Sequence, residues 1–412
     1  MNLKGKKVLI TQHRLVDFTG SEIITLELAE ALSTWGARVA IVCANYSDPI
    51  RAEFEKLGNV TVFDSLESKD LAYYFEKNSP DYAWIHHQII PPYLLEECLG
   101  HTKIIFNHMS AFYFQEFPIM DQVEEKLSDV IVYNSVETRR TFDDAGILKN
   151  AKAPHYLLNN AVPSLFFDNQ KRTYSKELKK ILIVSNHIPN ELRQAIDILR
   201  QNDIGVTIAG ISSAYTPEYK RIIPKDIIDA DVVISIGKTV QYALVVGAPV
   251  YCYDHFGGPG YINQTNYNQA KDLNFSGRGF SRKRATTIAR ELTSGYRHIV
   301  DEAKKLNKKH AGEYSLNSRL EDIFTLAERS KLRKEITEKE EVIYRAYYQV
   351  LNALFMRERS ADEHRRQALE LTRQLQKTNE SYQKLAKRLE RIYRVTGLKT
   401  FKKAYRAIKG RV

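Results

Sequence analysis

Histidines and amides gather where short apolar segments end, which is where side chains could do chemistry. Gln12 and His13 follow one such segment, and His86-His87-Gln88 follow another. Ligands of open parallel sheets bind beyond the carboxyl ends of the strands. A lone histidine is usually structural, but six of the eleven at equivalent ends favour a functional cleft: His13, His86, His87, His108, His187 and His255.

The same histidines do not have the spacing of a metal site. No H-E-x-x-H motif and no C-x-x-C arrangement occurs. The three cysteines are widely separated, as expected in a reducing compartment. Asp229 and Asp231 offer a carboxylate pair, but a turn or cap before the next strand is the preferred interpretation. We therefore expect no metal cofactor.

Three glycine-containing segments could present backbone N–H groups to a phosphate: Gly20-Ser21, Gly237-Lys238 and Gly257-Gly258. The first two precede helix-like patterns, and a helix N-terminus favours an anion. None is a Walker or G-x-G-x-x-G sequence, and each could be an ordinary turn. Together they favour a nucleoside diphosphate.

The elements that must position these residues alternate between strand and helix. Short apolar strands separated by helical patterns predict α/β units with parallel sheets covered on both faces. The pattern restarts after residue 180, which predicts two Rossmann-like domains facing each other. We expect a first domain over 1–165, a linker over 166–180, a second domain over 181–328, a coiled coil over 329–394 and a basic amphipathic tail over 395–412. The predicted strands are 8–11, 39–43, 60–63, 82–86, 104–107 and 130–133, then 181–185, 205–209, 232–236 and 250–253.

A heptad repeat runs through the third region. With Ile336 at position d and Tyr347 at position a, 13 of 17 core positions as far as Ile392 are apolar or aromatic. This period of 3.5 residues predicts a coiled coil that joins copies of the chain or binds a pathway partner through 336–392. The alternative is a single long helix docked on its own domain.

The tail carries most of the net charge. Residues 384–411 hold eleven basic residues and one acid, and so account for +10 of the net +11. Leu398, Phe401, Tyr405 and Ile408 share one helical face, the pattern of a helix on an anionic lipid surface. A frayed basic terminus is the plain alternative, followed by an RNA-binding tail. The nearly neutral body argues against a nucleic-acid-binding domain, so no nucleic-acid partner is expected.

No apolar run has the length of a signal peptide or a membrane span. The sequence therefore predicts a cytoplasmic protein, held peripherally at the inner face of the membrane by its tail.

Several motifs in order resemble the GT-B glycosyltransferases, specifically the retaining family 4, or group 1, enzymes of bacterial surface-glycan synthesis. They are the opening strand with Gly20-x-Glu22, the Asn134-Ser135 segment after a strand, the stretch 158–163 followed by Phe166, and Gly247-Ala248-Pro249-Val250. The resemblance covers roughly residues 6–325. It implies a GT-B fold with the donor nucleotide on the second domain and the acceptor on the first.

The resemblance also implies roles for residues. His108 would be the catalytic-site histidine beside the reacting sugar, and His13, His86 and His87 would lie on the acceptor side. The donor nucleotide would contact Gly20, Ser21, Asn186, His187, Gly237, Lys238, Gln241, Tyr242, His255, Gly257 and Gly258.

Two departures from the family pattern bear on the donor site. The ribose-binding Glu that usually precedes the G-x-P-V glycine by five residues is replaced by Tyr242, and the usual Arg/Lys pair near the first donor-domain strand is absent. Ribose binding could pass to Gln241 and phosphate binding to Lys238, or the site could be degenerate.

The leading expectation is a nucleotide-sugar-dependent hexosyltransferase, retaining by family, acting on a surface-polysaccharide or lipid-linked glycan acceptor. The alternative is a catalytically silent GT-B protein that acts as a scaffold in a glycan-assembly complex. A GT-B sugar-nucleotide epimerase is a third reading, but it has no use for a membrane-seeking tail. Sugar, base, acceptor, linkage and oligomeric state do not follow from the sequence.

Overall fold

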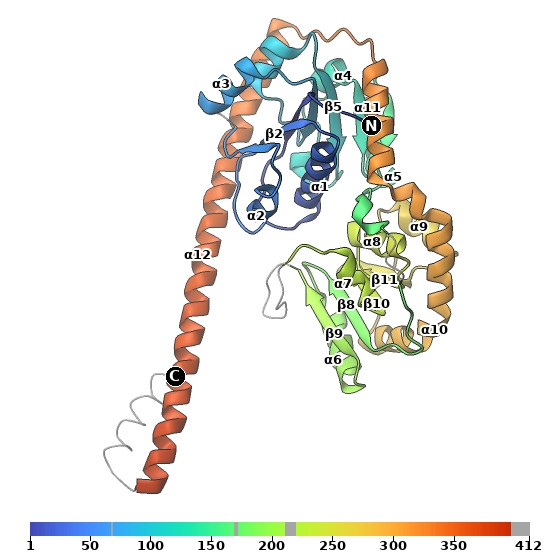
Figure 1. The fold of residues 1–412 in the computed structure, drawn as a ribbon, viewed down its shortest axis with the longest axis vertical. Coiled ribbons are helices and arrows are strands. Elements are labelled where there is room, and N and C mark those ends of the chain that lie inside the picture. Colours follow the sequence, from blue (N-terminus) through green and yellow to red (C-terminus); the bar gives the residue numbers. More distant parts are fainter. Residues whose placement is uncertain (67–68, 169–171, 211–219, 397–412) are drawn as a thin grey trace. The chain divides into compact units, whose positions relative to one another are not determined.

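The computed structural model describes residues 1–66, 69–168, 172–210 and 220–396 (Figure 1). The chain divides into two compact units, Met1–Val350 and Leu351–Val412. Each unit is described by itself. Within the first unit, the residues around the first sheet are called the first domain, and those around the second sheet the second domain.

The first domain is built on a seven-stranded parallel sheet in the order β3-β2-β1-β4-β5-β6-β7. Six of these strands were predicted, and the central residues of all of them except the edge strand β3 are buried because helices cover the sheet. The three-residue β7 escaped prediction because it is short and only half-buried. The strands are β1 (Lys7–Thr11), β2 (Arg38–Val42), β3 (Val60–Phe63), β4 (Tyr82–His86), β5 (Lys103–His108), β6 (Val130–Tyr133) and β7 (His155–Leu157).

Short helices connect these strands. Helix α1 begins at Gly20 behind the N-cap Thr19, and the Glu22 carboxylate accepts hydrogen bonds from the Thr19 backbone and side chain. The helical elements of this part are α1 (Gly20–Thr34), α2 (Arg51–Phe54), α3 (Lys69–Lys77), the π-turn Leu94–Cys98, the 3₁₀ turn Phe114–Glu116, α4 (Asp121–Leu127) and α5 (Val136–Ala145).

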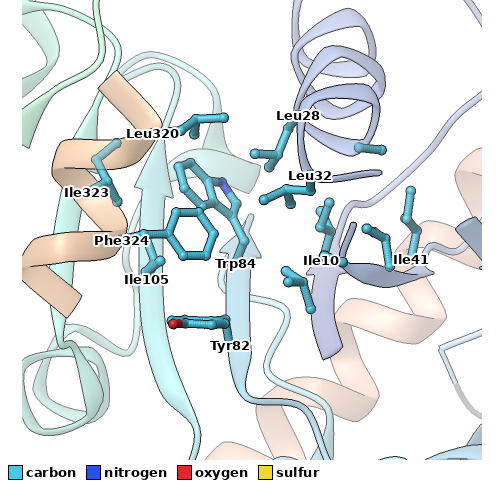
Figure 2. Packing of buried hydrophobic residues seen from close by; sticks show 14 of the residues in the cluster. Ile10, Leu28, Leu32, Ile41, Tyr82, Trp84, Ile105, Leu320, Ile323 and Phe324 are labelled. Atoms are coloured by element: carbon cyan, nitrogen blue, oxygen red, sulfur yellow. The ribbon is translucent and has the colours of Figure 1, made fainter. Parts of the chain in front are cut away.

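The core of the first domain includes a helix from far along the chain. Figure 2 shows Phe324 of α11 (Leu316–Arg329) against Trp84 and Tyr82 of β4, with ring centroids 6.3 and 4.8 Å apart. All three rings are buried. The sequence had assigned this helix to the second domain, whose predicted end was residue 328. Its apolar face instead completes the first core, which periodicity alone could not reveal.

The second domain is built on a five-stranded sheet in the order β12-β11-β10-β8-β9. Its four parallel strands were predicted, whereas the antiparallel edge strand β12 was not. The strands are β8 (Lys180–Val184), β9 (Gly205–Ala209), β10 (Val232–Ser235), β11 (Val250–Asp254) and β12 (Gly257–Tyr261). The helical elements are the 3₁₀ turn Ser164–Phe166, α6 (Asn190–Gln201), α7 (Pro224–Ile228), α8 (Lys238–Val246), α9 (Tyr267–Asp272), α10 (Ala285–His310) and the 3₁₀ turn Ala311–Tyr314. Two Rossmann-like sheets confirm the predicted fold class.

A single helix, α12 (Glu338–Thr396), follows and runs from the first unit into the second. In the first unit the Tyr344 and Tyr348 hydroxyls donate to the carbonyls of Gln88 and Leu66, so this part docks on the first domain. These tyrosines are not the predicted heptad core positions. Ile343 and Val350, which are, remain 45% and 66% exposed.

In the second unit, the heptad residues Leu371, Leu375 and Leu385 are likewise exposed. Pairing of this stripe with another chain stays a prediction. The basic amphipathic tail lies, from residue 397 onward, outside the described residues. Among the described helices, none combines the length and apolarity needed to cross a bilayer.

Candidate functional site

The carboxyl edge of the first sheet brings together the predicted histidines. His86 ends β4, His108 ends β5, and His13 follows β1, which lies beside β4. The ring centroids of His13 and His87 are 5.0 Å apart, and those of His86 and His87 are 6.1 Å apart. Strand ends that are separated in sequence therefore form one cluster, as the sequence predicted.

His86 cannot take the acceptor-side role assigned to it. Its side chain is fully buried, and Nε2 is 3.0 Å from Trp84 Nε1 and 2.9 Å from Asn107 Nδ2. Its Nδ1 lies 3.4 Å from the Thr25 hydroxyl of α1. Burial, followed by repulsion from His87, holds the pKa of His86 well below its usual range. This neutral imidazole links α1 to the sheet through its contact with the Thr25 hydroxyl.

The turn after β4 is strained. His87 and Gln88 adopt positive φ angles of 55° and 51°, a conformation that costs non-glycine residues about 1–3 kcal/mol. Its neighbours hold it: Gln88 donates to Glu124 at 2.9 Å, and His87 Nε2 lies 3.1 Å from Glu116. The Tyr344 hydroxyl donates to the Gln88 carbonyl and accepts from Ile90 N–H, at 2.8 and 2.7 Å. Strain maintained beside polar groups is typical of a functional edge.

His108 is paired with a carboxylate that sequence reasoning missed. Its Nε2 lies 2.6 Å from Glu124 Oε1, and both side chains are almost fully buried. Burial alone lowers the pKa of His108, but the Glu124 carboxylate opposes this, and the net shift is upward. The His108 catalytic role stays a prediction. What the structure shows is a buried ion pair at the base of the loop after β5.

His13 is the least buried of this cluster. Its pKa lies well below the usual value, first through burial and then through the neighbouring His87 and Arg14. At neutral pH the ring is therefore uncharged and can exchange hydrogen bonds with a neutral sugar hydroxyl. Gly20 and Ser21 open α1 after the loop that His13 begins, and the buried Glu22 carboxylate organises that loop by accepting from Val16 N–H at 3.1 Å.

The carboxyl edge of the second sheet gathers a second polar set. Asn186 and His187 follow β8. Asp254 is the last residue of β11, and His255 follows it. The rings of His187 and His255 are 5.8 Å apart, and Asp254 accepts from His255 N–H at 2.8 Å. Burial raises the pKa of Asp254, against the effect of His255. The predicted donor-side residues of β8 and β11 thus lie side by side.

Helix α8 begins at this edge without a side-chain cap. Its N-cap, Gly237, has φ 57°, a conformation that glycine adopts without strain. One turn on, Gln241 is buried, and its Oε1 has no hydrogen-bond partner among the described residues. A buried acceptor without a partner is costly, and a ligand donor group would relieve it. Together the open helix start and Gln241 form a candidate subsite.

The structure corrects the expected role of Lys238. Its Nζ lies 2.6 Å from Glu27 Oε2 of α1 and donates to the Ala161 carbonyl at 2.6 Å. A buried ammonium needs a counter-charge, and the fully buried Glu27 supplies it in place of a phosphate. Burial raises the pKa of Glu27, while Lys238 opposes that rise.

Tyr242 also fails to match its predicted donor contact. Its hydroxyl donates to Glu27 Oε1, and its ring stacks on Phe166 with centroids 4.2 Å apart. The position of the family's ribose-binding Glu is thus filled by a buried residue that contacts the first domain. Tyr242 thus contacts Glu27 and Phe166 in place of the predicted donor nucleotide, and ribose binding by Gln241 stays a prediction.

Gly257 and Gly258 have a packing reason for being glycine. A Cβ at Gly258 would lie 2.1 Å from the Cys252 carbonyl, and one at Gly257 would lie 2.7 Å from the backbone of Ser281. Both residues belong to β12 and approach the protein's own backbone. The chain itself therefore occupies the space where a Cβ would lie, and a phosphate contact to these glycines stays a prediction.

Two further ion pairs join the domains and were not predicted. Arg221 forms a two-pronged contact with Glu30 of α1, at 2.5 and 2.7 Å. Arg278 does the same with Glu137 at the start of α5. With Glu27, this gives three acidic residues of the first domain bound to bases of the second. Glu27 was detectable in principle, as a charge inside the apolar run Leu26–Ala29.

Among the described residues, no group of three or more His, Cys, Asp or Glu side chains is arranged to hold a metal ion.

Comparison with known proteins identifies the fold. No protein-family model and no curated protein matches the chain by sequence. Among solved structures, TcCGT1 in complex with UDP aligns with a TM-score of 0.50 at 11% identity, covering 78% of this chain and 98% of that one. At this identity the likeness shows the fold alone.

Two further similar structures are the glycosyltransferase WaaG, involved in lipopolysaccharide biosynthesis, and the UDP-GlcNAc 2-epimerase from Neisseria meningitidis bound to UDP-GlcNAc. WaaG has a TM-score of 0.48 at 10% identity, over 78% of this chain and all of that one. The epimerase has a TM-score of 0.47 at 10% identity, over 79% of this chain and all of that one. The fold is that of the GT-B glycosyltransferases.

Proposed function

We propose that this protein is a nucleotide-sugar-dependent glycosyltransferase with its donor site at the carboxyl edge of the second sheet. The observation that carries the proposal is the subsite at α8, where an uncapped helix start adjoins the unpartnered, buried Gln241. A helix N-terminus attracts a diphosphate, and the Gln241 amide oxygen can accept from a ribose hydroxyl. Asn186, His187 and His255 lie at the neighbouring strand ends and complete the site.

The mechanism follows from charge on the leaving group. Departure of a nucleoside diphosphate is assisted by N–H donors aimed at its phosphates, which the first turn of α8 offers. The first sheet's edge supplies the acceptor side, with neutral His13 and the His87 turn in contact range of sugar hydroxyls. We assign His108 to the reacting-sugar side, where its pair with Glu124 joins the end of β5 to α4. Lys238 holds the domains together instead of binding phosphate.

The remaining parts of the proposal come from the sequence and the family resemblance. Transfer is of hexosyl type with retention, to a surface-polysaccharide or lipid-linked glycan acceptor in cell-envelope synthesis, without a metal cofactor. The exposed heptad stripe within 336–392 binds a second copy or a pathway partner. The basic tail, 395–412, holds the cytoplasmic protein peripherally at an anionic membrane.

Incubation with a panel of nucleotide sugars and assay of released nucleoside diphosphate tests the activity. We expect release from one donor, with a rate that rises when glycan-lipid extract is added. Gln241→Ala should slow it, while Gln264→Ala, which removes an amide that donates to Glu302 of α10, serves as the matched control. If no donor is cleaved with or without extract, the silent scaffold is the better account.

A further inference from the structure

The loop between β5 and α4 exposes large apolar side chains directly after His108. Tyr113, Phe114 and Ile119 are 69%, 52% and 57% exposed, and Phe112 and Phe117 are exposed beside them. Clusters of this kind on a protein surface mark a site of interaction. Neither the donor site nor the histidine cluster uses these side chains.

The loop exposes no charged side chain to solvent. Its single acidic residue, Glu116, is buried and turned inward, where it contacts His87 and accepts from Met109 N–H at 3.1 Å, and it has no basic residue. The exposed side chains are therefore aromatic rings and Ile119, with one tyrosine hydroxyl and the partly buried amide of Gln115 as their polar groups. Amphipathic rings such as tyrosine favour the boundary between hydrocarbon and headgroups.

Several backbone N–H groups of the loop are paired within the protein. The N–H groups of Glu116, Phe117 and Ile119 donate to carbonyls inside the loop, at 2.9, 3.2 and 2.8 Å. Phe112 N–H donates to the Ser110 hydroxyl, Met120 N–H donates to Gln88, and Pro118 has no N–H. An unsatisfied N–H is costly in hydrocarbon, so this pairing lowers the free-energy cost of moving the loop from water into lipid. A protein partner would not require this internal pairing, and its interface would present more hydrogen-bonding groups.

We propose that the loop 112–119 inserts into the surface of a lipid bilayer. Phe112 lies under the Arg278 guanidinium of the second domain, 4.7 Å from its ring centroid, so the loop reaches the junction of the two domains. Resting on the proposed function, this places the acceptor side of the site at the membrane and identifies the acceptor class as lipid-linked. The contact is independent of the basic tail.

The test is partition of the full chain onto phosphatidylcholine vesicles without nucleotide. The lipid is uncharged, and at 1 M salt the Debye length is about 3 Å, so the tail adds little attraction. We expect wild type to bind, and Tyr113→Ser/Ile119→Ser to lower the partition coefficient roughly tenfold or more. The matched control, Tyr73→Ser/Ile223→Ser, removes the same two side chains at sites 60% and 45% exposed and should bind like wild type.

Circular dichroism of both variants checks that they fold. Absence of wild-type binding, or equal loss in both double variants, would overturn the proposal. Because no nucleotide is present, failure of the proposed enzymatic function leaves this result unaffected.

Discussion

Removal of the Tyr242 hydroxyl tests whether this residue joins the domains or contacts the donor nucleotide. In Tyr242→Phe the ring can stay stacked on Phe166, while the buried Glu27 carboxylate loses a donor. A hydrogen bond to a buried charged group contributes about 1.5–3 kcal/mol. We expect a loss of about 2 kcal/mol in the free energy of unfolding, roughly a 30-fold change in the equilibrium constant.

Chemical denaturation followed by circular dichroism measures this loss. The matched control is Tyr156→Phe, whose hydroxyl donates to an exposed carboxylate, Asp322, at 2.7 Å. It should cost less than about 1 kcal/mol, because water replaces the exposed contact. A second readout is nucleotide affinity, which Tyr242→Phe should leave within about twofold. Equal stability of the two variants, or a large loss of affinity in Tyr242→Phe alone, would refute the interdomain role.

Three further changes have expected outcomes. Lys238→Met leaves Glu27 buried without its counter-charge and should lower the free energy of unfolding by about 3–5 kcal/mol at pH 8. Because burial raises the pKa of Glu27, this loss of stability should be smaller at pH 5, where more of the carboxyl is protonated. Glu124→Gln removes the partner that raises the pKa of His108. The ion pair of His108 with Glu124 is fully formed below the ordinary histidine pKa and weakens as the pH rises through the raised pKa of His108. The difference in stability between the variant and wild type, measured in paired denaturation curves, should therefore be largest near pH 6 and shrink by pH 9. Tyr344→Phe removes the hydroxyl that bridges two backbone groups of the strained turn after β4 and should lower stability by about 1–3 kcal/mol, with increased hydrogen exchange in that turn.

Much of the fold follows from local pattern. Ten strands were predicted because buried parallel strands are short, apolar and β-branched, and their bounds differ by about a residue from those observed. β7 is too short for a pattern, and β12, Gly257–Tyr261, contains three glycines and a proline, which ordinarily mark a turn. The destination of α11 depends on tertiary packing, since its apolar stripe fits either domain.

The site could be predicted only as far as strand ends determine it. Topology brings His13, His87 and His108 to one edge because parallel strands end on the same side of a sheet. Which of them is buried depends on neighbours remote in sequence, such as Glu124 beside His108. The partners of Lys238 and Tyr242 were likewise invisible, because Glu27 lies more than 200 residues earlier.

The heptad pattern shows a further limit of sequence reasoning. Periodicity marked Ile343 and Val350 as core positions, yet Tyr344 and Tyr348 are the residues that dock on the first domain. One helix can carry two apolar or aromatic stripes, and the sequence alone does not indicate which of them packs against the rest of the same chain. The exposed stripe leaves room for a partner.

The central claim is that the second sheet's edge binds the nucleotide of a sugar donor, and calorimetric titration with UDP, dTDP, GDP and ADP tests it most directly. The account predicts saturable binding of one of these to wild type at a single site, weakened roughly tenfold in Gln241→Ala through loss of one hydrogen bond to a buried group. Heats of dilution alone for all four nucleotides at millimolar concentration would contradict it.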